Sequence, residues 1–149
     1  MSAKNPPGIG EEGTYCHVYN KGIEDRTIFA DDADFQVFLG YLEDYLSPPK
    51  TPESTKTDFT VNGRVFRGVP HQPKNYFKKV ELVAYSLKPD HFHLLLHEIT
   101  HKSLQAFIRS LCTRYSMYFN RKYKRTGTLF KGPYKSVIVK DKTGLLLLA

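Results

Sequence analysis

The chain has 149 residues, of which 40% are hydrophobic and 25% charged, as expected of one soluble globular domain with a sizeable core. It has no apolar run near the roughly 18 residues of a membrane span, and its N-terminus lacks a signal-peptide core, so we expect a cytoplasmic protein. Cys16 and Cys112 are too few and too distant for a disulfide framework or a zinc ribbon.

The first half of the chain predicts a leader, a strand and a helix. Residues 1–13 read as a loose leader because they are polar and contain proline and glycine. Thr14 to Asn20 alternates enough to be a strand. Acidic residues then favour a helix N-terminus, and apolar residues at helical spacing predict an amphipathic helix from about Ala33 to Leu46.

Residues 47–78 form the least regular segment and are interpreted as an insertion. Within it, Asn62-Gly63 separates two short alternating runs and supplies the positive φ angles of a type I′ turn. The segment from Phe59 to Phe66 is therefore predicted to be a β-hairpin. No function can be inferred for it from the sequence.

Two buried strands and a tight turn carry the most informative pattern. Val80 to Leu87 is rich in strand-forming residues, Lys88-Pro89-Asp90 predicts a turn, and the second strand begins at His91. His91 and His93 are two residues apart, so their imidazoles project from one face of the strand while Phe92 projects from the other. Such a pair is a plausible half of a divalent-metal site; the alternative is a pair of ordinary polar residues on a half-exposed strand.

The second half predicts a long helix, a basic loop and a strand. Thr100 or Ser103 can cap a helix from about Ser103 to Lys122, whose apolar stripe includes Tyr115, with Tyr118 on the same side. Both tyrosines are therefore expected to be core aromatics, on a helix behind the sheet. Tyr123 to Pro133 reads as a loop, Tyr134 to Val139 as a strand, and Lys142 to Ala149 as the start of a third helix.

The order strand, helix, strand, strand, helix, strand predicts an α+β fold of the ferredoxin-like or RRM-like βαββαβ type. This fold has a four-stranded antiparallel sheet with two helices on one face, and here it would carry an inserted hairpin. The open face of the sheet can then hold a site. The paired histidines would lie on a central strand.

Positive charge is concentrated in the second half of the chain. From Lys102 to Lys142 there are seven lysines, four arginines and one acid, so this segment carries +10 and the rest sums to 7 − 10 = −3. Such a segment is typical of a protein that binds a phosphate backbone, although a solvated charged surface is the simpler alternative. The candidate nucleic-acid-binding residues are Arg109, Arg114, Asn120, Arg121, Lys122, Lys124, Arg125, Lys131, Tyr134 and Lys135. Tyr134 or Phe130 could stack on unpaired bases.

At His91-Phe92-His93 the chain resembles the HUH-type single-tyrosine transposases, which include insertion-sequence and REP-associated tyrosine transposases. The resemblance extends from about Thr14 to Leu148, interrupted by the insertion. The other segments that carry it are His17 to Gly22, Leu87 to Leu96, Arg114 to Asn120 and Gly127 to Lys135.

The resemblance implies metal-dependent cleavage and transfer of single-stranded or hairpin DNA. His91 and His93 would hold a divalent cation, Mg²⁺ or Mn²⁺, and a tyrosine would form a 5′-phosphotyrosine link. His17 could approach this site but is expected to have a structural role. In the family the nucleophilic tyrosine and a third metal ligand lie on a helix after the last strand, which places them beyond Ala149 here. The resemblance leaves a homodimer or a monomer open, because insertion-sequence members are commonly dimers and some REP-associated members act as monomers.

Two other functions stay open from the sequence. A non-catalytic DNA-hairpin-binding module derived from a transposase would use the same basic residues without strand transfer. An RRM-like RNA binder would share the fold, but the paired histidines argue against it because an RNA-stacking sheet requires aromatic residues at His91 and His93.

Overall fold

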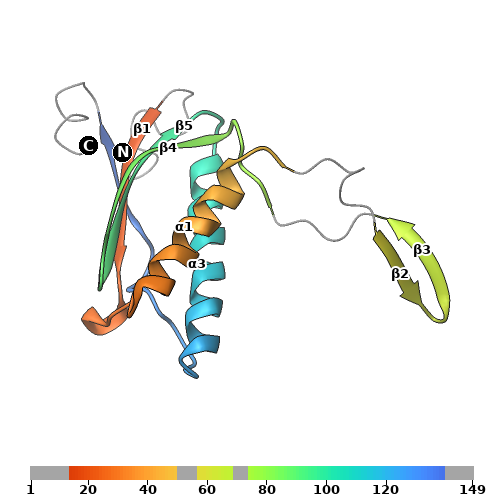
Figure 1. Cartoon of the computed structure of the whole chain (residues 1–149). Coiled ribbons are helices and arrows are strands. Elements are labelled where there is room, and N and C mark those ends of the chain that lie inside the picture. Colours follow the sequence, from red (N-terminus) through yellow and green to blue (C-terminus); the bar gives the residue numbers. More distant parts are fainter. Residues whose placement is uncertain (1–13, 50–56, 69–73, 140–149) are drawn as a thin grey trace.

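The computed structural model describes residues 14–49, 57–68 and 74–139 (Figure 1). The proposed leader, residues 1–13, and the expected third helix, residues 142–149, lie outside the described residues. The elements of the main body are β1 (Thr14–Lys21), the 3₁₀ turn η1 (Ile23–Asp25), α1 (Asp32–Leu46), β4 (Val80–Lys88), β5 (His91–Glu98), α3 (Ser103–Lys122) and β6 (Lys135–Val139).

The four main strands form one antiparallel sheet in the order β4-β5-β1-β6. Helices α1 and α3 lie together against one face of this sheet, which leaves the other face uncovered by helices in the part of the chain that is described (Figure 1). This arrangement confirms the predicted ferredoxin-like fold. It also confirms that the paired histidines lie on a central strand, because β5 pairs with both β4 and β1.

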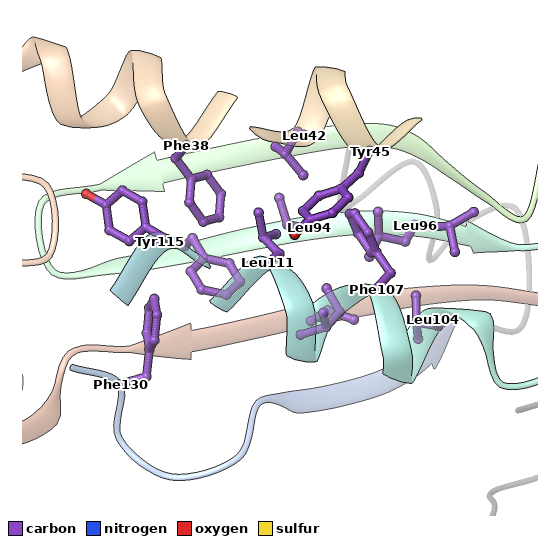
Figure 2. Packing of buried hydrophobic residues seen from close by; sticks show 14 of the residues in the cluster. Phe38, Leu42, Tyr45, Leu94, Leu96, Leu104, Phe107, Leu111, Tyr115 and Phe130 are labelled. Atoms are coloured by element: carbon purple, nitrogen blue, oxygen red, sulfur yellow. The ribbon is translucent and has the colours of Figure 1, made fainter. Parts of the chain in front are cut away.

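The core lies between the sheet and the two helices. On β5, Phe92, Leu94 and Leu96 are fully buried and point toward the helices. Their partners include Phe38 of α1 and Leu111 of α3, which meet them in the same cluster (Figure 2). Because strand side chains alternate between faces, this burial directs His91 and His93 to the open face.

The start of α3 differs from the expected cap. Neither Thr100 nor Ser103 is the N-cap; that residue is Lys102, in the left-handed conformation with φ 64°. The Ser103 hydroxyl instead donates to the carbonyl oxygens of Thr100 and Lys79, at 2.7 and 3.0 Å. The buried carboxylate of Glu98 accepts the N–H of Leu104 at 3.0 Å, so an acid at the end of β5 replaces the local cap.

The inserted hairpin forms a two-stranded sheet of its own, β2 (Thr57–Val61) and β3 (Arg64–Gly68). Asn62 and Gly63 have φ angles of 52° and 78°, as the predicted type I′ turn requires. The strands extend two residues beyond the predicted bounds at each end. Within the described residues no helix is long and apolar enough to cross a membrane.

The junction between β1 and η1 leaves no room for a side chain at Gly22. A Cβ atom added there would lie 2.1 Å from the carbonyl oxygen of Arg26, which is a backbone atom and cannot move alone. We therefore expect Gly22→Ala to lower the free energy of unfolding by about 1–3 kcal/mol, measured by urea denaturation.

Gly40, in the middle of α1, provides the matched control. A Cβ there meets nothing within 4 Å, so Gly40→Ala should raise the free energy of unfolding by about 0.5–1 kcal/mol through its helix propensity. Equal effects of the two substitutions would contradict the steric account of Gly22.

Candidate functional site

The open face of the sheet carries a group of aromatic and imidazole side chains on its two central strands. We call it the histidine face; its members are Tyr15, His17 and Tyr19 from β1, and His91, His93 and His97 from β5. The register sets Tyr19 opposite His93 and Tyr15 opposite His97. The rings of Tyr15 and His97 stack with centroids 4.3 Å apart and planes 7° apart.

The turn before His91 is held by three backbone hydrogen bonds. The carbonyl oxygen of Pro89 accepts the N–H groups of Ile28 and Phe29, at 2.7 and 3.0 Å, and that of Asp90 accepts the N–H of Gly22, at 3.0 Å. The end of β1 and the connector before α1 therefore fix where β5 begins. This explains why His91 stands next to the first strand although some 70 residues separate them in sequence.

Each histidine of the pair is held through its Nδ1 atom. Nδ1 of His91 lies 2.7 Å from Oδ1 of Asp90, and Nδ1 of His93 lies 2.8 Å from Nε2 of His17. The rings of His17 and His93 are also stacked, with centroids 4.9 Å apart. Burial lowers the pKa of His17; burial and then the neighbouring His17 and His91 lower that of His93. The neutral form is thus favoured for His17 and for His93, and a histidine must be neutral to bind a metal.

These contacts fit a divalent cation held by two protein ligands. With both Nδ1 atoms engaged, Nε2 of His91 and Nε2 of His93 are the nitrogens left to bind. A carboxylate such as that of Asp90 is a usual orienting partner behind a ligating histidine, and His17 takes this place behind His93. Within residues 14–49, 57–68 and 74–139, no group of three or more His, Cys, Asp or Glu is arranged to hold a metal. A cation on this pair would keep most of its coordination positions for water and phosphate, as Mg²⁺ prefers.

Two of the predicted DNA-binding residues lie beside His91. Lys131 and Lys135 line a pocket of about 290 Å³ together with Lys21 and His91. Lys135 faces Tyr19 across the β1–β6 pairing. Lys21 was not among the residues expected to bind DNA, because it precedes the basic half of the chain; only the register of β1 against β5 reveals its position opposite His91.

Other predicted DNA-binding residues belong to α3 and the loop that follows it, not to the histidine face. Arg109, Arg121 and Lys124 are exposed. Arg114 differs, since its guanidinium carbon lies 4.0 Å from the Tyr41 ring centroid and one nitrogen lies 3.6 Å from Oδ2 of Asp44. Its role in the structure is to join α3 to α1.

Asn120 and Arg125 organise the loop after α3. Nδ2 of Asn120 donates to the carbonyl oxygen of Gly127 at 3.0 Å, and its Oδ1 accepts from the Arg125 guanidinium at 2.6 Å. Arg125 also donates to the carbonyl oxygen of Thr128. These side chains hold the loop in shape, a role that the sequence-based expectation of DNA contacts did not include.

A buried carboxylate fixes the end of α3 to the start of α1. Asp34 is fully buried and accepts the hydroxyls of Tyr118 and Tyr123 at 2.6 and 2.7 Å, and the ammonium of Lys122 at 2.9 Å. Burial alone would raise the pKa of Asp34, but these bonds outweigh it and lower the pKa to about 2. Lys122, expected to contact DNA, thus has internal carboxylate partners, which raise its own pKa.

The two aromatic residues considered for base stacking, and the two tyrosines expected in the core, lie on the helix side of the sheet. Phe130 is 6% exposed and belongs to the core, so the expectation that it stacks on bases is wrong. Tyr134 is half-buried against the core and, with Arg109, lines a pocket of about 460 Å³. Tyr115 is fully buried and donates to the carbonyl oxygen of Ile28, while Tyr118 donates to Asp34. The structure confirms the prediction that Tyr115 and Tyr118 pack with the core.

A family model described as "Transposase IS200 like" matches residues 71–147, which are 77 of the 149 residues. A crystal structure assigned as a transposase from Deinococcus radiodurans R1 is similar with a TM-score of 0.54 and 15% identity, covering 95% of this chain and 92% of that one. The structure of a REP-associated tyrosine transposase bound to a REP hairpin is similar with a TM-score of 0.55 and 9% identity, covering 99% and 67%.

No curated protein matches this sequence. At these identities the two solved structures establish the fold alone. The family model covers β4, β5, α3 and β6, so it includes His91 and His93 but not β1, which supplies the other half of the histidine face. The chain belongs to the IS200-like transposase family.

Proposed function

We propose that this chain is a DNA transposase of the HUH single-tyrosine type, which binds single-stranded or hairpin DNA on the histidine face. The observation that carries the proposal is the arrangement of the imidazoles of His91 and His93. His91 and His93 lie next to each other with Nδ1 engaged by Asp90 and His17, so both Nε2 atoms are left for a cation. The hairpin-bound neighbour supports a hairpin as the DNA form.

In this proposal each residue of the site has a stated task. His91 and His93 hold Mg²⁺ or Mn²⁺ through Nε2, while Asp90 and His17 orient the two rings. A bound divalent cation supplies Lewis acidity that polarises a phosphoryl oxygen and stabilises a leaving 3′ oxygen. The remaining exposed cations of α3 and its loop, Arg109, Arg121 and Lys124, would contact the DNA backbone farther away.

The second candidate function is a hairpin-binding module that does not cleave DNA. It is favoured by the position of Tyr115 and Tyr118, whose hydroxyls are bonded on the helix side of the sheet. An attacking oxygen must come within about 3–3.5 Å of the phosphorus, and the hydroxyls of Tyr115 and Tyr118 cannot approach so closely from behind the sheet.

Tyr19, in contrast, lies on the histidine face. Its ring stands beside that of His93, with centroids 5.6 Å apart.

Two measurements test these functions. Substoichiometric Mn²⁺ should broaden the imidazole NMR signals of His91 and His93 before those of His97 and His101, and His91→Ala should weaken Mn²⁺ binding. Broadening elsewhere with this pair untouched would remove the metal assignment. A labelled DNA hairpin should bind with an affinity that falls as salt rises.

A denaturing gel with 5′- and 3′-labelled hairpin in Mn²⁺ separates the transposase from the binding module. A covalent protein–DNA band that depends on His91 supports strand transfer by this chain, and Tyr19→Phe tests whether Tyr19 provides the oxygen. Retained hairpin binding without any covalent band supports the module. Adduct formation that requires Tyr115 or Tyr118 would contradict the assignment of both to the core.

A further inference from the structure

A small basic pocket adjoins the metal pair at the end of the histidine face. It has a volume of about 290 Å³ and is lined by Tyr19, Asn20, Lys21, His91, Lys131 and Lys135. Its walls come from three adjacent strands or their ends: β1, β5 and the chain just before and within β6. We call it the lysine pocket.

Backbone bonds bring Lys131 to Lys21 and fix the pocket. The N–H of Lys131 donates to the carbonyl oxygen of Lys21 at 2.8 Å, and the N–H of Ile23 donates to that of Leu129 at 2.8 Å. Asn20 is 6% exposed, and its Nδ2 donates to the carbonyl oxygen of Gly132 at 3.1 Å. The segment from Leu129 to Gly132 is therefore attached to the end of β1, and these backbone bonds place Lys21 next to Lys131.

The charges of the pocket are only partly neutralised from within. The ammonium of Lys21 lies 2.8 Å from Oδ1 of Asp25, so this exposed ion pair partly neutralises the charge of Lys21. In the described part of the chain, no carboxylate lies within ion-pair distance of the ammonium groups of Lys131 and Lys135. Asp90 also acts electrostatically on Lys21, and Asp25 on Lys131. Three ammonium groups near two carboxylates still leave an excess of positive charge at the cavity, and this favours an anion.

The groups next to the pocket favour a phosphate as the bound anion. His91 forms one wall, so a group bound here lies directly beside one bound at the His91–His93 pair. Successive phosphates of one nucleic-acid strand have this kind of side-by-side relation. Tyr19 adds an aromatic ring to the same wall, against which a base or sugar of that strand can pack.

We propose that the lysine pocket binds one backbone phosphate of single-stranded DNA, adjacent to the phosphate at the metal pair, with Lys21, Lys131 and Lys135 as its ligands. This inference rests on the proposed function and adds a subsite to it. It also gives a task to Lys21 and to the segment from Gly127 to Lys135. Three cations on one phosphate hold the strand at a fixed position relative to His91, which a general basic surface does not do.

The test is a double-mutant cycle on Lys131→Gln and Lys135→Gln, with a fluorescent 12-nucleotide oligothymidylate as the probe. Each single variant should weaken binding several-fold, and the double variant should lose less than the product of the two effects because both act on one phosphate. The log–log salt slope should fall by about 0.7 in total, the value for one single-strand phosphate. Lys79→Gln, an exposed lysine at the opposite end of the sheet, is the control and should change neither quantity.

A titration with inorganic pyrophosphate makes the pocket testable without DNA. It should shift the backbone amide signals of Lys21, Lys131 and Gly132 in the wild type and leave them unchanged in the double variant. Fully multiplicative losses, with a slope change for each lysine, would overturn the single-phosphate pocket while leaving DNA binding intact. Pyrophosphate binding with no affinity for oligothymidylate or a hairpin would retain an anion site there but overturn both its assignment to a DNA phosphate and the proposed function. Absence of the pyrophosphate shifts would overturn the pocket.

Discussion

Asp34→Ala is expected to lower the free energy of unfolding by about 3–5 kcal/mol, the largest effect of any single substitution considered for stability. Its carboxylate accepts four bonds, from Tyr118, Tyr123, Lys122 and the N–H of Ala30, and the substitution leaves these donors without their acceptor. Urea denaturation at pH 7 measures the loss. Asp32→Ala is the matched control, since Asp32 is an exposed acid in the first turn of α1 and should cost below about 1 kcal/mol.

The same carboxylate makes stability depend on pH in a defined direction. The pKa of Asp34 is lowered from 3.8 to about 2 in the folded chain, so the unfolded chain binds the proton first as pH falls. The contribution, about 2 kcal/mol, is therefore complete above the unfolded value and is lost as pH falls from about 4 to 2. The difference in stability between wild type and Asp34→Asn should shrink over this interval. A constant difference from pH 6 to pH 2 would contradict the ionised, bonded state of Asp34.

His17→Phe is expected to weaken Mn²⁺ binding by about 10- to 100-fold although His17 is not one of the two proposed ligands. For Nε2 of His93 to bind a cation, the proton of that neutral ring must be on Nδ1, where it donates to Nε2 of His17, 2.8 Å away. Phenylalanine keeps a ring in the stack but offers no acceptor. His93 then loses the contact that selects its tautomer, and the free Mn²⁺ signal in electron paramagnetic resonance measures the change in affinity.

His17→Gln separates this role from simple packing. The side-chain oxygen of glutamine lies about as far from its own Cα as Nε2 of histidine does. It can therefore accept the Nδ1 proton of His93, and Mn²⁺ affinity should be largely restored. Nitrogen-15 NMR of metal-free protein gives a second readout: His93 should be the Nδ1-protonated tautomer in wild type and His17→Gln, and a mixture in His17→Phe. Equal Mn²⁺ affinity in wild type and His17→Phe would show that His17 does not position His93.

The parts of the fold that follow from local pattern could be predicted from the sequence. The helix from Asp32 to Leu46 follows from its acidic start and apolar spacing, and Asn62-Gly63 predicts its turn because few residues adopt positive φ. The facing direction of His91 and His93 follows from the two-residue period of a strand. These features depend on residues close in sequence, so the amino-acid sequence alone is enough to predict them.

Features that depend on strand register could not be predicted in the same way. The contact of His17 with His93 joins residues 76 apart, and nothing in the local sequence of β1 specifies its partner. Glu98 replaces the expected cap of α3 because its carboxylate is buried beside the first turn, which only the packing decides. Three residues that the sequence suggests are available to DNA have partners within the protein. These are Arg114 with Asp44, Asn120 with the carbonyl oxygen of Gly127, and Lys122 with Asp34.

The position of β1 between β5 and β6 determines when the site can exist during synthesis. β1 is made first, but its first neighbour begins only at His91, after about 70 further residues, which take on the order of 4–14 s to translate. During that interval both edges of β1 lack their final partners. The contact of His17 with His93 comes next, and the contacts of Lys21 with the segment before β6 come last. A nascent chain therefore completes the contact between His17 and His93 before Lys131 and Lys135 reach the end of β1.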